Sequence, residues 1–172
     1  MASFTDRIVG AASLSPSTYE EVEADKSSMG QAMTVVVLSS IAAGIGTGEG
    51  ILAGILGALM SLVAWFIWAF VTYLIGTKML PQPQTEADIG QLLRTTGFAA
   101  SPGLLRVLTV IPGLGSIIGL VISVWMLAAM VVAVRQALDY TSTWRAVGVC
   151  IVGWLLMVLV TVVLIGMVAA MV

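Results

Sequence analysis

The sequence predicts an all-α fold: a polytopic bundle of five transmembrane helices with the N-terminus inside and the C-terminus outside. Hydrophobic residues make up 59% of the 172 residues and charged residues only 9%, against about a quarter in soluble domains. Long apolar runs recur along the chain, and ~20 apolar residues cross a hydrocarbon core of ~30 Å. This topology places all but one of the Lys and Arg residues on one side of the membrane, as expected for cytoplasmic loops.

The N-terminal segment, residues 1–28, is polar to amphipathic and is predicted to be cytoplasmic. An apolar stripe in its first ten residues predicts a short helix lying in the membrane interface. Ser15 and Pro16 are typical N-cap and first residues of a second, acidic helix, with Tyr19 and Val22 as its apolar contacts. Two roles are open for this acidic helix: it rests on the lipid headgroups, or it is a docking site for a partner.

The membrane domain comprises residues 29–172. A polar stretch before the third span predicts a further amphipathic helix, from Gln82 to Thr96, on the membrane surface. In a four-span alternative, residues 98–115 are re-entrant or lie on the surface. That alternative puts the basic residues of the second and last polar loops on opposite sides, so the charge asymmetry favours five spans. The predicted spans are about 29–46, 51–76, 98–111, 116–135 and 146–170.

Arg106 is the first candidate for function, because an ionisable side chain at the centre of a span costs roughly 2.5–3.5 kcal/mol. Three roles are open: an anchor reaching toward the cytoplasmic interface, a contact with an anionic lipid or with Asp88 or Asp139, and a place on a transport pathway. Glu49 lies in the predicted outside loop 47–50. It is either a water-facing carboxylate at a helix start or a cavity residue that binds a cation or proton.

Small residues at four-residue spacing predict close packing between neighbouring helices, by default within the chain. Prolines and glycines around the third span predict kinks or turns there. The predicted packing residues are Gly50, Gly54, Ala58, Gly115 and Gly119, and the predicted kink residues are Pro102, Pro112 and Gly113.

Several function classes are disfavoured by what the sequence lacks. Cys150 is the single cysteine and there is no histidine, which excludes an intramolecular disulfide and a Cys/His metal cluster. The residues contain no catalytic group, no phosphate-binding loop and no basic patch for nucleic acid. We therefore expect no enzymatic activity, no cofactor, no metal and no nucleic-acid partner.

A set of motifs follows one another in a recognisable order. They are Thr18–Asp25, Gln31–Ala32, Arg94–Pro102, Ile111–Gly115, Trp125 and Val134–Leu138. Across about residues 15–165 this order resembles the Yip family of small five-span membrane proteins, named for Ypt-interacting proteins, in its short prokaryotic form. The resemblance implies an N-inside body of five helices. Eukaryotic relatives are associated with Rab-type GTPases, trafficking and membrane shaping, but this chain lacks their long cytosolic N-terminal region, so GTPase binding is not expected.

We therefore expect a non-enzymatic, multi-pass protein of the plasma or inner membrane. It organises the bilayer or acts as an accessory or scaffold subunit of a membrane complex. Its expected partners are membrane lipids, with a homo-oligomer or another protein of a membrane complex as further partners. The alternative is a small transporter or channel component with a polar cavity near Arg106 and Glu49.

Overall fold

The computed structural model describes residues 2–171, and for Gly50, Leu164, Ile165 and 167–171 it describes the backbone alone. The described residues form helices joined by turns and by one longer loop, 80–88, and contain no strand, which confirms the predicted all-α class. Two of the short elements are 3-10 helices, η1 and η3, and η2 is a π-helical turn. In chain order the elements are α1 (Phe4–Ala12), α2 (Pro16–Ala24), η1 (Lys26–Ser28), α3 (Met29–Gly46), α4 (Gly50–Leu74), η2 (Ile75–Met79), α5 (Ile89–Phe98), η3 (Ser101–Val110), α6 (Gly115–Ala137) and α7 (Thr143–Met171).

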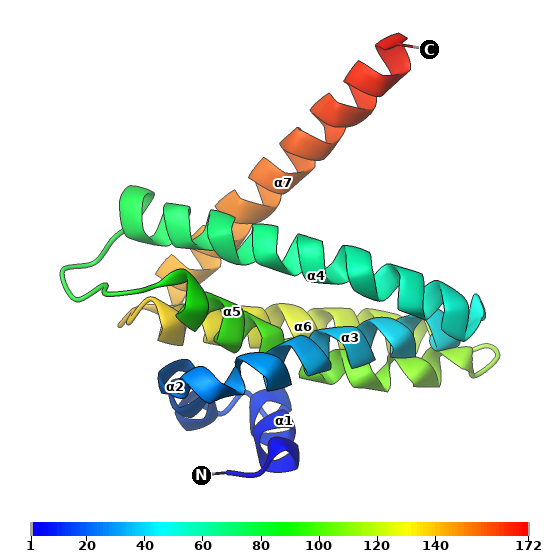
Figure 1. The fold of residues 1–172 in the computed structure, drawn as a ribbon, viewed down its shortest axis with the longest axis horizontal. Coiled ribbons are helices and arrows are strands. Elements are labelled where there is room, and N and C mark those ends of the chain that lie inside the picture. The colour runs from blue at the N-terminus through cyan, green and yellow to red at the C-terminus, as the bar shows by residue number, and fades with distance from the viewer. Residues whose placement is uncertain (1, 172) are drawn as a thin grey trace.

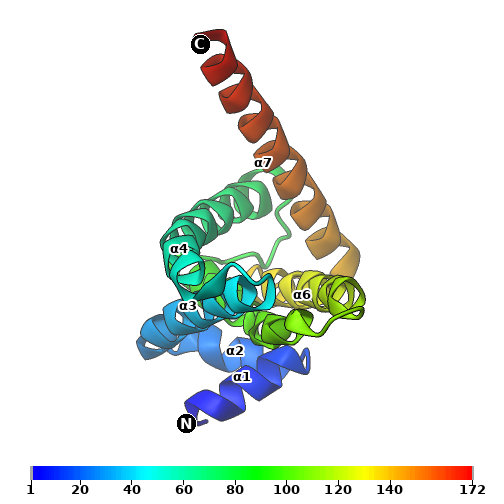
Figure 2. The same ribbon diagram turned by 90° about the vertical axis from the view of Figure 1, so that its right-hand side faces the viewer.

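Four helices of the described chain are long and apolar enough to cross a membrane: Lys26–Gly46, Ile51–Met79, Gly115–Ala137 and Thr143–Val163. Helix α3 lies beside α4, and α6 runs along the other side of α5 and η3. Helix α7 diverges from the others along its length (Figures 1 and 2). The short helices α1 and α2 pack against the bundle, where α2 contacts α5 and α6, and α1 contacts η3. The termini therefore lie on opposite sides of the bundle.

The third predicted span, 98–111, is part of a longer composite rod rather than a helix of its own. Helix α5 ends at Phe98, a turn follows at residues 99–100, and η3 continues in the same direction beside α3 (Figure 1). The rod breaks where it does because Pro102 has no N–H and cannot continue the α-helical hydrogen bonds. Ten α-helical and ten 3-10 residues give the rod a length of about 35 Å.

The prediction of a surface helix over residues 82–96 is wrong, because α5 begins at Ile89 and every residue from Leu92 to Ala99 is buried. The polar composition was misleading because the hydroxyls bond within the helix. Thr95 Oγ1 donates to the Gln91 carbonyl at 3.0 Å, and Thr96 Oγ1 donates in the same way one residue further on. Threonines satisfied by their own helix need no water, so they tolerate burial.

Close backbone approaches hold α3 against its neighbours. A Cβ atom added at Gly54 of α4 would lie 2.8 Å from Ile41 Cα, and one added at Gly46 of α3 would overlap the carbonyl oxygen of Arg106 in η3. Likewise, Gly103 of η3 leaves no room for a Cβ beside the hydroxyl of Ser39. Small residues thus bring α3 close to both α4 and η3, as in other membrane helix pairs.

The predicted packing residues fall at two of the helix contacts. Gly54 and the buried Ala58 lie on the face of α4 that α3 covers, while Gly115 and Gly119 of α6 face Thr109 of η3. The surroundings of the fifth, Gly50, lie outside the described residues.

Two glycine turns close the end of the bundle where α3 meets α4 and η3 meets α6. Gly48 ends α3 with a φ of +78°. Gly113 has a φ of +77°, and the Leu114 N–H donates to the Ile111 carbonyl at 3.2 Å. With Pro112 before it, this is a type II turn. Pro112 and Gly113 therefore end the rod, and Pro102 marks the break inside it.

The contact at Gly46 can be tested by adding one methyl group. Gly46→Ala should lower the free energy of unfolding by about 1–3 kcal/mol, because the new Cβ meets rigid backbone of η3. Thermal unfolding in detergent measures this as a lower midpoint. The control is Gly30→Ala in the same helix, where a Cβ meets nothing within 4 Å and should stabilise by up to about 1 kcal/mol. Equal midpoints for the two variants would contradict the close approach.

Candidate functional site

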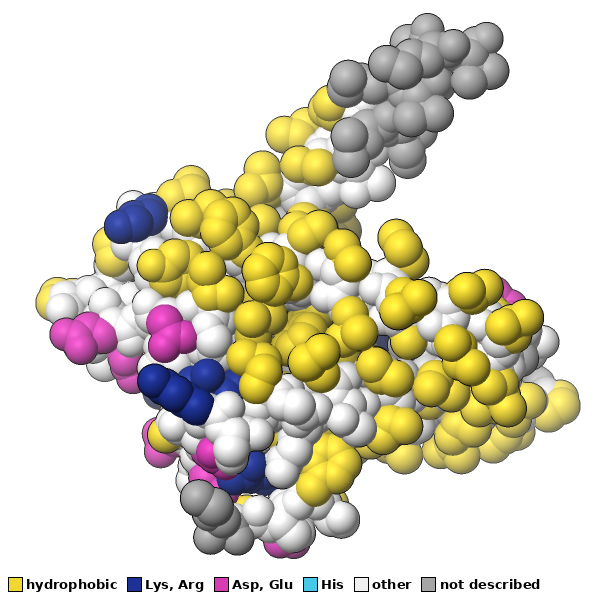
Figure 3. All heavy atoms as spheres, viewed as in Figure 1, with side chains coloured by type: hydrophobic (Ala, Val, Ile, Leu, Met, Phe, Trp, Pro, Cys, Tyr) yellow, Lys and Arg dark blue, Asp and Glu magenta, His cyan; other side chains and the backbone are white. Residues whose placement is uncertain are grey.

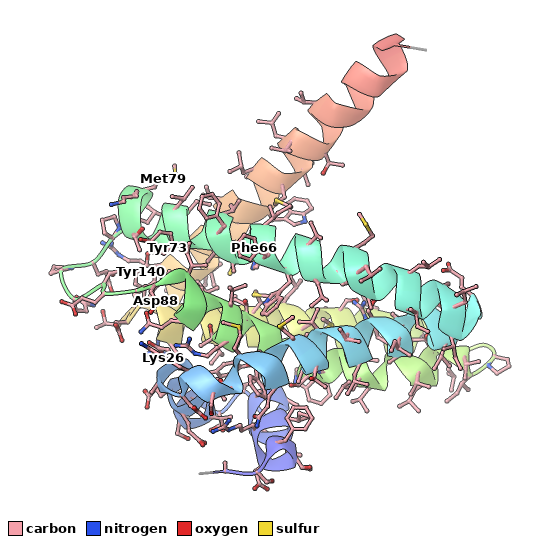
Figure 4. The ribbon with its side chains drawn as sticks, in the orientation of Figure 1. Lys26, Phe66, Tyr73, Met79, Asp88 and Tyr140 are labelled. Carbon is pink, nitrogen blue, oxygen red and sulfur yellow. The ribbon has the colours of Figure 1, made fainter. Side chains whose placement is uncertain are left out.

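Charged side chains gather at one end of the bundle, around α2 and the loop that follows α4 (Figure 3). Lys26, Asp88 and Tyr140 lie at this end, which we call the charged end (Figure 4). Its loops are joined by hydrogen bonds from the Tyr140 hydroxyl to the Leu80 carbonyl at 2.7 Å and from Arg145 Nη1 to the Pro81 carbonyl at 3.1 Å. The opposite end, with the glycine turns at Gly48 and Gly113, is called the turn end.

Arg106 lies in η3, away from the charged end. Because residues three apart eclipse one another in a 3-10 helix, Gly103, Arg106 and Thr109 share one face. This face packs into the angle between α3 and α6: Gly103 meets Ser39 and Met126. The 3-10 form of η3 thus directs the Arg106 side chain into the bundle.

Two cavities meet at Arg106. The first, of about 230 Å³, is lined by Ala43, Gly119, Arg106 and the hydroxyl side chains of Thr47, Thr109 and Ser123, and is called the polar cavity after these hydroxyls. The apolar cavity, of about 390 Å³, lies between α4, α6 and α7, and its walls include Trp68, Met126, Met130 and Trp154. Arg106 and Ser123 line both cavities, so the Arg106 side chain lies at the boundary between the polar and the apolar cavity.

Arg106 has no carboxylate partner in the described part of the chain, where the ion pairs within 4 Å join Arg7 to Glu21 and to Asp25. Asp88 instead caps α5 by accepting the Gln91 N–H at 2.8 Å, and Asp139 follows α6 in a left-handed turn with a φ of +52°. Both aspartates lie beside the loops of the charged end, so the structure does not bring them to Arg106.

Arg106 also borders the turn end of the bundle. Its polar cavity includes Thr47, which follows the last residue of α3 at the turn end. Glu49 lies nearby, exposed at the start of α4 and beside a third cavity of about 200 Å³. Ala43 and Thr47 line both this cavity and the polar cavity, so Glu49 and Arg106 flank the same end of α3.

A second arginine site joins the N-terminal helices, and the sequence reasoning missed it. Arg7 is 2% exposed and donates to Glu21 Oε1 at 3.0 Å, to Asp25 Oδ2 at 2.7 Å and to Gln31 Oε1 at 2.9 Å. This network ties α1 to α2 and to the start of α3. A single arginine on the apolar stripe of α1, followed by an acidic helix, was the available signal.

A third arginine attaches α2 to the composite rod. Arg94 of α5 is 5% exposed, and its Nε donates to the carbonyl oxygens of Val22 at 3.1 Å and Glu23 at 3.0 Å. From α6, Trp125 Nε1 donates to the Ala12 carbonyl at 2.7 Å. These bonds satisfy carbonyls at the ends of α1 and α2, so the N-terminal helices are part of the folded body.

The described residues contain no group of three His, Cys, Asp or Glu side chains placed to hold a metal ion. What the arrangement offers chemically is a guanidinium with five N–H donors and no acceptor, set beside an apolar space. Such a group binds anions, and carboxylates and phosphates best.

Taken together, these features define a polytopic helical membrane protein with a polar, folded N-terminal segment. Residues 12–165 match the family model described as the Yip1 domain. The chain therefore belongs to the Yip1 domain family, as the order of its motifs predicts. Searches of curated proteins and of solved structures find no significant match.

The charged end contains one carboxyl group with a shifted pKa near neutrality. The pKa of Glu23 is raised to about 7, mainly by burial and then by the negative charge of Asp139, while Arg94 opposes the shift. Glu20 and Asp88 add smaller effects of the same sign as Asp139. Glu23 Oε1 accepts a hydrogen bond from Gln91 Nε2 at 3.0 Å, so this carboxyl group lies within the contact between α2 and α5.

Glu23 should make the stability of the protein depend on pH. Between its unfolded pKa of 4.5 and its folded pKa of about 7, the folded state binds more protons, so the free energy of unfolding falls as the pH rises. Glu23→Gln cannot ionise, so its free energy of unfolding should decrease less than that of wild type as the pH rises. Thermal midpoints at about pH 5 and about pH 8 measure this decrease. Glu86→Gln, at an exposed site, serves as the control. Equal slopes for wild type and Glu23→Gln would contradict the prediction.

Proposed function

We propose that this protein is a five-span, non-enzymatic membrane protein that organises the bilayer or serves as an accessory or scaffold subunit of a membrane complex. One observation carries the proposal: α7 diverges from α4 and α6, so that apolar faces which pack together in a closed bundle remain open (Figure 2). In a membrane, such faces contact lipid chains or a helix of another protein.

The open faces are large and apolar. On α7, Ile151, Trp154 and Leu155 are 53%, 60% and 54% exposed, and on α4 Phe66 is 53% exposed. Hydrophobic side chains also cover much of the visible surface of the bundle away from the charged end (Figure 3). Continuous apolar surface on this scale marks a lipid or protein interface.

The geometry supports five spans with the N-terminus inside. The composite rod of α5 and η3, about 35 Å long by its residue count, is long enough for a hydrocarbon core of ~30 Å and runs beside α3 (Figure 1). Lys26, Arg135 in the last turn of α6 and Arg145 in the first turn of α7 share the charged end. Because cytoplasmic loops are rich in Lys and Arg, we assign the charged end to the cytoplasm and α7 to an outward crossing.

A second candidate function, a small transporter, is favoured by the cavities at the turn end, where Arg106 and Glu49 flank α3. A transport path also has to reach the charged end. There, the rod is buried from Leu92 to Ala99, and this packed segment lies between Arg106 and the charged end. The structure therefore supports the non-transporting function better.

The topology predicts which side each loop faces. In a Cys150→Ser background, cells carrying Gln84→Cys, Pro112→Cys or Thr141→Cys, all at exposed positions, are treated with a membrane-impermeant thiol reagent. Pro112→Cys should react in intact cells, and the other two only after permeabilisation. In the four-span alternative, Gln84→Cys and Pro112→Cys share a side and Thr141→Cys reacts from the other, so that pattern would overturn the fifth span.

The proposed role predicts that the protein binds lipid or other protein chains and does not transport protons or small ions. Native mass spectrometry of the full chain from mild detergent should show retained lipid, further copies or a partner protein. In liposomes, wild type, Arg106→Gln and Glu49→Gln should all leave proton and small-ion flux at the level of protein-free vesicles. A lipid-free monomer, together with a flux that either substitution abolishes, would replace this proposal with the transporter.

A further inference from the structure

We propose that Arg106 binds the anionic headgroup of a membrane phospholipid whose acyl chain lies in the apolar cavity between α4, α6 and α7. This inference deepens the proposed membrane-organising function by naming a ligand class and its site. It rests on that function in requiring the bundle to be embedded in a bilayer.

The polar half of the site offers one strong donor group. The hydroxyls around Arg106 are already used as donors within the protein: Thr109 Oγ1 donates to the Arg106 carbonyl at 2.8 Å, Ser123 Oγ to the Gly119 carbonyl at 2.8 Å, and Thr47 Oγ1 to the Ala43 carbonyl at 3.1 Å. The guanidinium, in contrast, forms no ion pair in the described part of the chain. A charged donor group without a counter-ion inside a membrane bundle favours an anionic ligand.

The apolar half of the site suits a hydrocarbon chain. The Trp68 indole N–H already donates to Met130 Sδ at 3.2 Å, so the ring presents apolar surface to the cavity. Met126 and Leu127 add flexible and branched aliphatic walls. The volume of about 390 Å³ falls in the range of about 300–1,000 Å³ typical of ligand sites.

The two halves are arranged in the order that a lipid requires. Along the rod, the walls pass from Ala99 and Ala100 to Arg106 and then Thr109; along the antiparallel α6, they pass from Met130 to Ser123. On both elements the site thus becomes polar toward the turn end, where the chain reverses at the membrane boundary. A lipid would place its headgroup toward that boundary and its acyl chain toward the bilayer centre.

The bilayer is also the natural source of the ligand. Trp154 of α7 lines the apolar cavity and is 60% exposed, and α7 itself diverges from α4 (Figure 2). A lipid can enter sideways there without crossing the packed core. A free phosphate would satisfy Arg106 but leave the apolar cavity without an occupant.

The test measures lipid binding to the full chain in mild detergent. Brominated phosphatidylglycerol and brominated phosphatidylcholine are titrated, and quenching of tryptophan fluorescence reports occupancy, because Trp68 and Trp154 line the cavity. Wild type should bind the anionic lipid more tightly. Arg106→Gln should reduce this preference by about tenfold or more, the size expected for a lost charge-assisted hydrogen bond. Arg106→Lys should keep part of it.

Matched variants separate this site from general attraction. Arg145→Gln removes an exposed arginine at the charged end and should leave the preference unchanged. Ala100→Leu narrows the apolar cavity and should weaken both lipids alike. Inorganic phosphate at about 50 mM should not displace the lipid, because it lacks the chain that fills the apolar cavity.

Three results would overturn the inference: an unchanged preference in Arg106→Gln, an equal loss in Arg145→Gln, or displacement by inorganic phosphate, which would indicate a simple anion site. If Arg106→Gln does not fold, Arg106→Lys replaces it. Equal affinities of Arg106→Lys for the anionic and the neutral lipid would then overturn the inference. The quenching assay does not depend on the sidedness of the loops. It can therefore fail while the cysteine labelling confirms five spans, and the reverse also holds.

Discussion

The architecture depends on how closely α3 approaches its neighbours. Gly46, Gly54 and Gly103 let α3 lie against both α4 and η3 with little side chain between the backbones. Dispersion forces grow steeply as such surfaces approach, and lipid-embedded helices have no hydrophobic effect between them to replace those forces. Because α3 contacts α4, α5 and η3, this packing also fixes the face of η3 that carries Arg106. The position of the candidate site thus follows from glycines that take no part in it.

Three arginines of this chain show what distinguishes a structural cation from a binding one. Arg7 and Arg94 are almost fully buried, and each donates to oxygen atoms of the protein: Arg7 through Nη2 to carboxylates, and Arg94 to backbone carbonyls at the end of α2. Both side chains thus bind groups of the protein itself, as expected for residues that hold the N-terminal helices to the bundle, although Arg7 Nε is buried without a partner. Arg106 is half-buried and lies between two cavities. This difference in surroundings is the basis for proposing Arg106, and not Arg7 or Arg94, as a ligand-binding residue.

Much of the fold was predictable from local signals. Length and hydropathy identify the four long helices, and Ser15–Pro16 and Pro112–Gly113 mark a helix start and a turn where the structure has them. Tyr19 and Val22, the predicted apolar contacts of α2, are fully buried. Burial of α5 was not predictable, because its threonines look polar until their hydrogen bonds to the same helix are known. The partners of Arg7 and the 3-10 form of η3 depend on residues distant in sequence, which no local pattern reveals.

The length of α7 has a mechanical consequence. Its 29 residues make a helix of about 44 Å, well beyond a hydrocarbon core of ~30 Å. A helix packed along its whole length takes its inclination from its neighbours, but α7 is joined to the bundle near its start and diverges thereafter (Figure 1). Its inclination therefore depends on the lipid around it: the helix tilts further from the bilayer normal in a thin bilayer than in a thick one. A change in the tilt of α7 moves Trp154, so the apolar cavity that this residue lines has a wall whose position depends on the thickness of the membrane.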